Sequence, residues 1–290
     1  MNTRYPRVPG VERAEELRYM DNNKPIGIFD SGLGGLTAAG RLASLLPAED
    51  ILYLGDTGRV PYGGKGRETI IKYAKQDIEF LLKMDIKAIV VACGTVSTTA
   101  LDEIAGDYSV PIYGVVEPTV ARAARTTKNK KIGIIGTEAS IKSGAYERML
   151  KKCPGVELMS RACPLFVPLV ENGRVSPGDI VIETVTAEYL APMKDAGVDT
   201  LILGCTHYPL LEPVISAYMG DETTLISAGS ATAEFVAEEI SRMGLLSDDK
   251  RQGVHKYYVS DSTENFSALA SVFLRRDIQG EVHKIDWDKF

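Results

Sequence analysis

The sequence lacks any apolar run long enough to cross a bilayer, and residues 1–24 lack the apolar core that a secretory signal needs. It also lacks a basic excess, since 33 Lys and Arg stand against 39 Asp and Glu for a net charge of -6. Binding to a phosphate backbone needs a basic surface, so nucleic acid is not expected as a partner. The one basic run, residues 128–131, is interrupted by Asn129 and is typical of a solvated loop. We therefore expect a cytoplasmic protein that binds neither nucleic acid nor membrane.

Cysteine is scarce: there are four in 290 residues, and none forms a Cys-x-x-Cys pair. In a reducing compartment disulfides are not expected, and without paired cysteines a zinc site is not expected either. We interpret Cys153 and Cys163 as a loop residue and a core residue. Cys93 and Cys205 each follow an apolar run at the point where a loop opens. A cysteine in that position is inert packing by default, so a reactive role needs further support.

Short β-branched runs alternate with segments of helical periodicity over most of the chain. The runs "KPIGIFD", "DILYLGD", "KAIVVAC" and "VPIYGVV" are separated by segments such as "ETIIKYAKQDIEFLLKM", which places Ile71, Ala74, Ile78, Leu81 and Leu82 on one helical stripe. This alternation predicts an α/β protein whose mostly parallel sheets are covered by helices on both faces. Ligands of such sheets bind outside the carboxyl ends of the strands.

The pattern then repeats within the chain. "KKIGIIGTEAS" at residues 130–140 echoes "KPIGIFDSGLG" at 24–34, and "DTLILGCTH" at 199–207 echoes "KAIVVACGT" at 87–95. Both echoes run in the same order, which indicates an internal duplication. We predict two similar three-layer α/β domains related by a pseudo-twofold axis, with the active site in the cleft between them. The expected limits are an N-terminal arm at 1–23, a first domain at 24–117 plus 227–290, and a second domain at 118–226.

The C-terminal part is expected to return to the first domain from about residue 227. "TTLISAGSATAEFVAEEISRMG" predicts a strand, then a helix with Ser230 as its N-cap that ends at Gly244. "HKYYVSD" predicts one more strand. We interpret His255 and His283 as surface or hydrogen-bonded histidines.

If the duplicated loops face one another, Cys93 and Cys205 approach a ligand from opposite sides. Inversion at a carbon centre needs that geometry, because one group removes a proton from one face and the other delivers a proton to the opposite face. A free thiol has a pKa of about 8.5, so its neighbours must tune it for this work. His207 lies two residues after Cys205, and Asp30 ends a strand expected beside that of Cys93. Backbone N–H groups in the "DSG", "CGT" and "CTH" turns could hold a carboxylate.

Other interpretations of these residues stay open. Asp30 could only cap the following helix, His207 could be structural, and Glu171 could be a surface carboxylate. "DSGLGGLT" also resembles part of a dinucleotide fingerprint, in which Asp56 would hold a ribose. Thr37 stands where that fingerprint has its third small residue. A nicotinamide oxidoreductase would leave the paired cysteines unexplained.

Seven motifs, in order, resemble the glutamate racemases, the cofactor-independent two-cysteine enzymes of the aspartate/glutamate racemase superfamily. They are "GIFDSGLGGLT", "LGDTGRVPYGGK", "VVACGTVST", "GVVEP", "IGTEASIKSGAY", "CPLFVPLVE" and "LGCTHYPLL", within residues 24–244. The resemblance implies Cys93 and Cys205 as catalytic acid/bases, assisted by Asp30 and His207, with Glu171 near the second cysteine. It implies these substrate-binding residues: Asp30, Ser31, Tyr62, Gly63, Gly94, Thr95, Thr206 and His207. It further implies no cofactor, no metal, a homodimer, and D-glutamate supplied for bacterial peptidoglycan.

One position departs from the family's pattern. The first cysteine motif usually reads Cys-Asn-Thr, and here Gly94 replaces the Asn that contacts the amino acid. A hydrogen bond to a charged ligand is worth about 1.5–3 kcal/mol, so substrate preference could differ. Two alternatives to a glutamate racemase therefore remain. One is a racemase of aspartate or another amino acid, and the other is a non-catalytic amino-acid-binding protein.

Overall fold

The computed structural model describes residues 21–274, 278 and 282–287. Residues 1–20 of the expected N-terminal arm lie outside the described residues. The chain forms two separate sheets whose paired strands are all parallel. The first has the order β10-β9-β2-β1-β3-β4. Its strands are β1 (Ile26–Asp30), β2 (Ile51–Gly55), β3 (Ala88–Val91), β4 (Ile112–Tyr113), β9 (His255–Val259) and β10 (Val282–Lys284).

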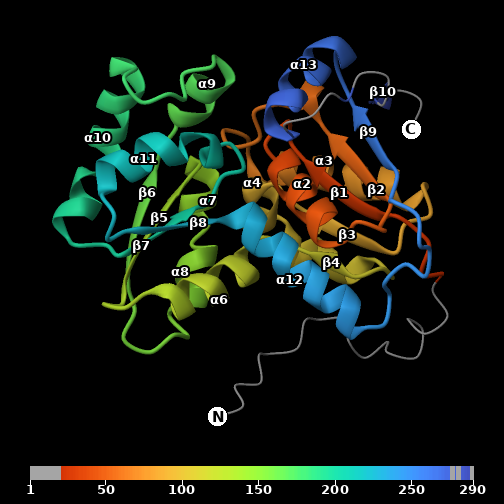
Figure 1. Ribbon diagram of the computed structural model, residues 1–290, viewed down its shortest axis with the longest axis horizontal. Helices are drawn as coiled ribbons and strands as arrows, with labels where there is room; N and C mark the ends of the chain where they lie inside the picture. Colours follow the sequence, from red (N-terminus) through yellow and green to blue (C-terminus); the bar gives the residue numbers. More distant parts are fainter. Residues whose placement is uncertain (1–20, 275–277, 279–281, 288–290) are drawn as a thin grey trace.

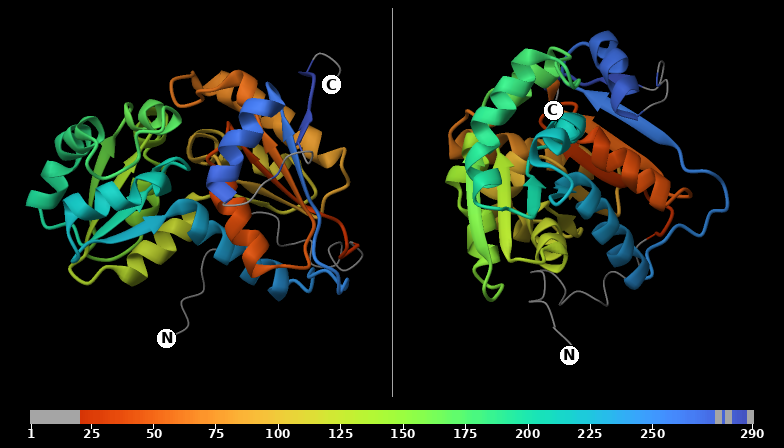
Figure 2. Two further views of the ribbon diagram at one scale, coloured as in Figure 1. Left: turned by 45° about the horizontal axis from the view of Figure 1, so that its top comes forward. Right: turned by 60° about the vertical axis from the view of Figure 1, so that its left-hand side comes forward.

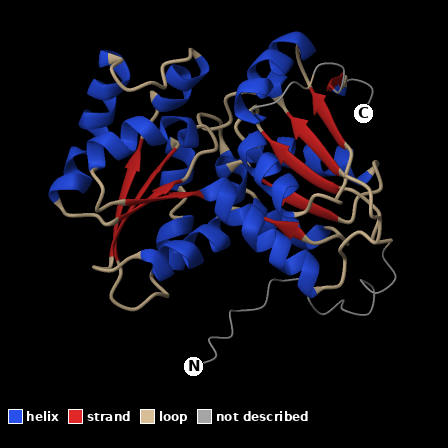
Figure 3. Ribbon diagram, viewed as in Figure 1, coloured by secondary structure: helices blue, strands red, loops and turns tan. Residues whose placement is uncertain are grey.

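The second sheet has the order β6-β5-β7-β8, which repeats the β2-β1-β3-β4 part of the first. Its strands are β5 (Lys131–Gly136), β6 (Glu157–Ala162), β7 (Thr200–Leu203) and β8 (Thr224–Ser227). The two Lys-x-Ile-Gly-Ile runs become β1 and β5, and the two runs before a cysteine become β3 and β7. Figure 3 shows the two sheets side by side, each with helices around it. The predicted fold of two α/β units with parallel sheets is therefore confirmed.

Helices cover both faces of the first sheet. One face packs on α2 (Leu36–Leu45), α12 (Ala228–Arg242) and α13 (Thr263–Leu274), and the other on α3 (Arg67–Leu82), α4 (Gly94–Thr99) and α5 (Leu101–Ile104). Short 3₁₀ turns lie at Thr57–Arg59 and Ala105–Asp107. Each fully buried Leu or Ile side chain in these layers contributes about 1.5–3 kcal/mol. Helix α3 buries Ala74, Ile78 and Leu81 of the predicted stripe, but Ile71 and Leu82 are only partly buried and Ile70 is buried in their place. The helix also buries the carboxylate of Asp77.

The second sheet is covered in the same way. One face packs on α9 (Phe166–Glu171), α10 (Ile180–Asp195) and α11 (Glu212–Met219), and the other on α6 (Val116–Thr126) and α8 (Ala145–Leu150). The short helix α7 (Glu138–Lys142) follows β5, and a 3₁₀ turn at Tyr208–Leu211 precedes α11. No helix among the described residues is long and apolar enough to cross a membrane.

Helix α12 connects the two units. It packs on α2 of the first and on α6 and β8 of the second, and in Figure 1 it begins between the two units and runs below the first. The left view of Figure 2 shows the two units side by side, with the start of α12 between them. The prediction of Ser230 as its N-cap was wrong, because β8 runs into the helix and the Ser227 hydroxyl accepts the Ser230 N–H. After α12 the chain adds β9 beside β2 of the first sheet. The domain limits stay a prediction, and α6 crosses one of them at 117/118.

Candidate active site

The carboxyl ends of strands from both sheets converge on one cavity of about 40 Å³. The segments that follow β1, β2 and β3 supply one side, and those that follow β5 and β7, together with helix α9, supply the other. The lining residues are Ser31, Val60, Pro61, Tyr62, Gly63, Cys93, Gly94, Thr95, Thr137, Val167, Glu171, Gly204, Cys205, Thr206 and His207.

Cys93 forms part of the wall on the side of the first sheet. It follows β3 and is the N-cap residue of α4, and it is buried. Its Sγ donates to the Ser31 hydroxyl at 3.5 Å. Burial, with the negative charge of Asp30 as a second cause, raises the pKa of the Cys93 thiol to about 12. Cys93 is therefore a neutral thiol near neutral pH.

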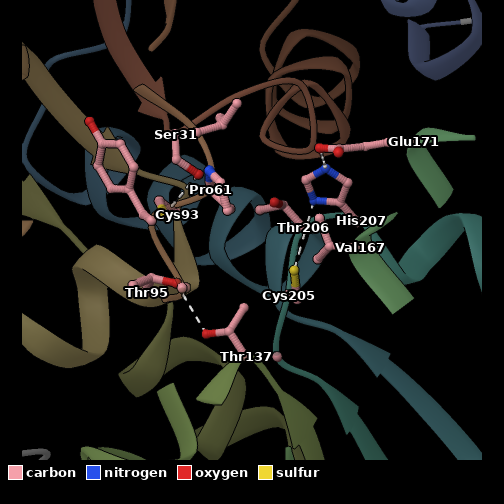
Figure 4. A pocket seen from close by; sticks show the side chains of 15 residues that line it. Ser31, Pro61, Cys93, Thr95, Thr137, Val167, Glu171, Cys205, Thr206 and His207 are labelled. Atoms are coloured by element: carbon pink, nitrogen blue, oxygen red, sulfur yellow. Dashed lines mark hydrogen bonds and ion pairs between the residues drawn. The ribbon is translucent and has the colours of Figure 1, made fainter. Parts of the chain in front are cut away.

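Cys205 lies on the side of the second sheet and has a histidine beside it. Its Sγ is 3.8 Å from Nδ1 of His207, whose Nε2 is 3.3 Å from a carboxylate oxygen of Glu171. Burial acts to lower the pKa of His207, but its contacts with Cys205 and Glu171 outweigh burial and raise the pKa to about 10. An imidazolium has an N–H on both ring nitrogens, which matches an acceptor on each side. Figure 4 shows this chain of three side chains opposite Cys93 and Ser31.

Asp30 is buried at the end of β1 and does not line the cavity. One oxygen accepts the N–H groups of Gly32 and Gly35 at 3.1 Å each, which fixes the turn that carries Ser31. The other oxygen accepts the Thr206 hydroxyl at 3.5 Å, across the two units. Asp30 thus shapes the turn before α2, as in the capping interpretation, and also contacts the Cys205 loop.

The two sides of the site are in close contact. A Cβ added to Gly94 would lie 2.4 Å from the carbonyl oxygen of Gly204, and one added to Gly34 would lie 2.2 Å from Oγ1 of Thr206. The hydroxyls of Thr95 and Thr137 lie 3.1 Å apart across the same junction. Gly94 therefore lets the loops that carry the two cysteines touch backbone to backbone. This is a physical reason for glycine at the position where the family usually has Asn.

Every predicted site residue except Asp30 lines this cavity. Sequence reasoning missed five lining residues, which are Val60, Pro61, Thr137, Val167 and Gly204. Thr137 had a usable signal, because the duplication aligns it with Ser31: each directly follows the first strand of its sheet. The others had none, since nothing in a single sequence places them at a ligand.

The dinucleotide interpretation does not fit the geometry at Asp56. Four side-chain donors already occupy its two oxygens, from Arg59, Tyr62, Ser260 and Trp287. A ribose hydroxyl would have to displace one of them. Among the described residues, no group of three or more His, Cys, Asp or Glu side chains is arranged to hold a metal ion.

Comparison with known proteins gives a consistent result. The family described as Asp/Glu/Hydantoin racemase matches residues 46–236. A curated glutamate racemase of Geobacter metallireducens is 46% identical over 264 residues, which cover 90% of this chain and 96% of the relative. The crystal structure of glutamate racemase from Francisella tularensis in complex with D-glutamate superposes with a TM-score of 0.84 at 36% identity, covering 93% of this chain and 100% of that one. An aspartate racemase from Picrophilus torridus, with a TM-score of 0.56 and 17% identity over 76% of this chain and 94% of its own, shares the fold alone.

Proposed function

The chain belongs to the glutamate racemase family, and we propose that it interconverts L- and D-glutamate by proton transfer between Cα and two thiols. The observation that carries the proposal is that Cys93 and Cys205 line one cavity from different sheets. One sulfur removes the Cα proton from one face, and the other delivers a proton to the opposite face. A single group would have to move around the substrate to do both.

The two thiols have different surroundings, and this difference supports opposite roles for them when the reaction begins in one direction: one is the base and the other is the acid. The protonated His207 stabilises negative charge on the sulfur of Cys205, which is then able to accept the Cα proton. Cys93, held as a neutral thiol beside Ser31, donates to the other face. After one conversion Cys205 carries a proton and Cys93 has lost one, and the reverse reaction restores the starting protonation of both thiols.

The intermediate carries negative charge that spreads from Cα onto the substrate carboxylate. Donors placed in advance around such charge lower the barrier, and a site closed to water makes them more effective. We assign this role to the turns at Ser31, Gly94 and Thr206 and to the hydroxyl of Thr95.

Close relatives named glutamate racemase support glutamate over aspartate as the substrate, and the aspartate racemases are far more distant. We further propose that the protein acts in the bacterial cytoplasm, as a homodimer, and supplies D-glutamate for peptidoglycan. The family resemblance supports these three points.

A panel of L-amino acids tests the substrate. Purified protein without added cofactor is given each amino acid, and formation of the D-isomer is measured. We expect kcat/KM for L-glutamate to exceed that for L-aspartate by at least about a hundredfold, since a misplaced carboxylate leaves donors in the pocket unpaired. A preference for aspartate would overturn the substrate. Absence of Cα hydrogen exchange with every amino acid would instead favour a non-catalytic binding protein. Binding of NADH, measured by fluorescence, would favour the nicotinamide oxidoreductase.

Substitution of Gly94 tests the contact between the two cysteine loops. A methyl group there would overlap the Gly204 carbonyl, so Gly94→Ala should push the loops apart and move a sulfur away from Cα. Because a displacement of about 1 Å can cost about a hundredfold in rate, we expect kcat/KM for L-glutamate to fall by about that factor. Gly106→Ala is the matched control, since a Cβ there meets nothing within 4 Å. If the two variants were equally active, the close contact between Gly94 and the Gly204 carbonyl would not be part of the catalytic state.

A further inference from the structure

A buried cluster of charged and aromatic side chains lies directly behind the loop that carries Tyr62 and Gly63. It holds two carboxylates without solvent exposure, Asp56 after β2 and Asp77 on α3, together with the guanidinium of Arg59. Nε of Arg59 donates to Asp56 at 2.5 Å, and its Nη2 donates to Asp77 at 2.9 Å. Nothing in the racemase chemistry uses these groups.

Tyr62 connects the cluster to the active site. Its hydroxyl donates to Oδ2 of Asp56 and lies 3.3 Å from Oδ2 of Asp77. The Tyr62 side chain is buried, yet Tyr62 and Gly63 both line the cavity with the two cysteines. The hydrogen bonds that hold the Tyr62 phenol therefore set the position of this loop.

The C-terminal part of the chain closes the cluster on its other side. The second oxygen of Asp56 accepts the Ser260 hydroxyl at 2.7 Å and Nε1 of Trp287 at 3.1 Å. The Arg59 guanidinium lies over two rings, 4.2 Å from the centre of Tyr73 and 4.3 Å from that of Trp287. Both oxygens of Asp56 thus have two donors each, and Arg59 has both charged partners and two aromatic rings against it.

The charges in the cluster balance if one carboxyl keeps its proton. Burial, then repulsion by Asp56, raises the pKa of Asp77 well above its usual value. A neutral Asp77 can donate through Oδ2 to the Tyr62 oxygen while the Tyr62 hydroxyl donates to Asp56. In this arrangement each hydrogen bond between the three side chains has one donor and one acceptor. One guanidinium then faces one carboxylate. A buried uncompensated charge, by contrast, would be strongly unfavourable.

We propose that Asp56 and Arg59 are positioning residues, which hold the Tyr62–Gly63 loop at the substrate from behind, with Asp77 as a neutral hydrogen-bond partner. This inference rests on the racemase function proposed above. It assigns a role to the segment after β9 as well, because Ser260 and Trp287 complete the support of a loop about two hundred residues earlier.

The matched variants Asp56→Asn and Asp77→Asn test the inference, because the same change is made at two equally buried carboxyls. Asn at 77 can accept from Arg59 and donate to Tyr62, as a neutral Asp does. Asn at 56 removes the charge that pairs with Arg59. We expect Asp56→Asn to raise KM for L-glutamate by about tenfold or more while kcat falls by less than about threefold. Asp77→Asn should raise KM by less than about threefold.

Arg59→Lys provides a second readout, since lysine keeps the positive charge but lacks the planar guanidinium with its several N–H donors. It should raise KM as Asp56→Asn does, so the inference stays testable even if Asp56→Asn fails to fold. Thermal melting verifies that each compared variant is folded. Two results would overturn the inference: an unchanged KM in folded Asp56→Asn or Arg59→Lys, or an equal rise in KM for Asp77→Asn. Absence of racemisation by the wild-type protein would instead refute the proposed function, so the two failures are distinguishable.

Discussion

Replacing either Cys93 or Cys205 with Ser should lower kcat for racemisation by at least about a thousandfold, the upper part of the range for loss of a general acid or base. A hydroxyl is a much weaker acid than a thiol, and its alkoxide is not populated near neutral pH. Both directions should fail in each variant, since each direction uses one sulfur as base and the other as acid. The measurement is D-glutamate formation from L-glutamate, and the reverse, with thermal melting to verify folding.

Cys153→Ser is the matched control, because Cys153 is a free cysteine far along the chain from both loops and does not line the cavity. It should stay within about threefold of the wild type. The single variants also separate the two faces of Cα. With one sulfur left, each variant should exchange the Cα hydrogen of only one enantiomer with solvent deuterium. If both variants exchanged the same enantiomer, the two sulfurs would not lie on opposite faces.

The second large effect is expected at His207. Asn at this position keeps a polar side chain of similar size but cannot carry a positive charge beside Cys205. We expect His207→Asn to lower kcat by about a hundredfold in the direction in which Cys205 is the base. Because the pKa of His207 is raised to about 10, the wild-type histidine stays protonated below that pH, so the loss should be nearly constant from pH 6 to 9.

Glu171→Gln provides a graded comparison, since it removes the carboxylate at Nε2 of His207 but leaves the contact with Cys205 intact. The Glu171 side chain is 44% exposed, and solvent screens part of its interaction. Its effect should therefore be about tenfold at most. A variant without His207 that kept full activity in both directions would show that the imidazolium does not assist Cys205.

The duplication made much of this architecture predictable from one sequence. The two Lys-x-Ile-Gly-Ile runs and the two runs before a cysteine became strands β1, β5, β3 and β7, in equivalent places of two sheets. Because parallel strands end at the same edge, the residues after them had to gather there. Cys93, Cys205 and His207 line the cavity for that reason. The confirmed family resemblance agrees with this interpretation but was not needed for it.

Contacts between distant segments could not be predicted. Asp56 meets Ser260 and Trp287, and no local pattern links positions so far apart in the chain. Asp77 stands in an amphipathic helix where a polar residue is usually exposed, and its contacts with Arg59 and Tyr62 accompany its burial. The Ser230 cap was misplaced by three residues, because a strand that runs directly into a helix leaves no turn signal. The close approach of Gly94 to Gly204 likewise depends on how the two units pack, which no single loop encodes.

The central claim is that two sulfurs act on opposite faces of one carbon. The most direct test starts from L-glutamate in deuterium oxide and follows the label at Cα during the first few per cent of conversion, by mass spectrometry and proton NMR. Two thiols predict that newly formed D-glutamate carries deuterium while the remaining L-glutamate keeps its original hydrogen. If the first D-glutamate retained the hydrogen of the substrate, a single group would be acting on both faces, and the account would be contradicted.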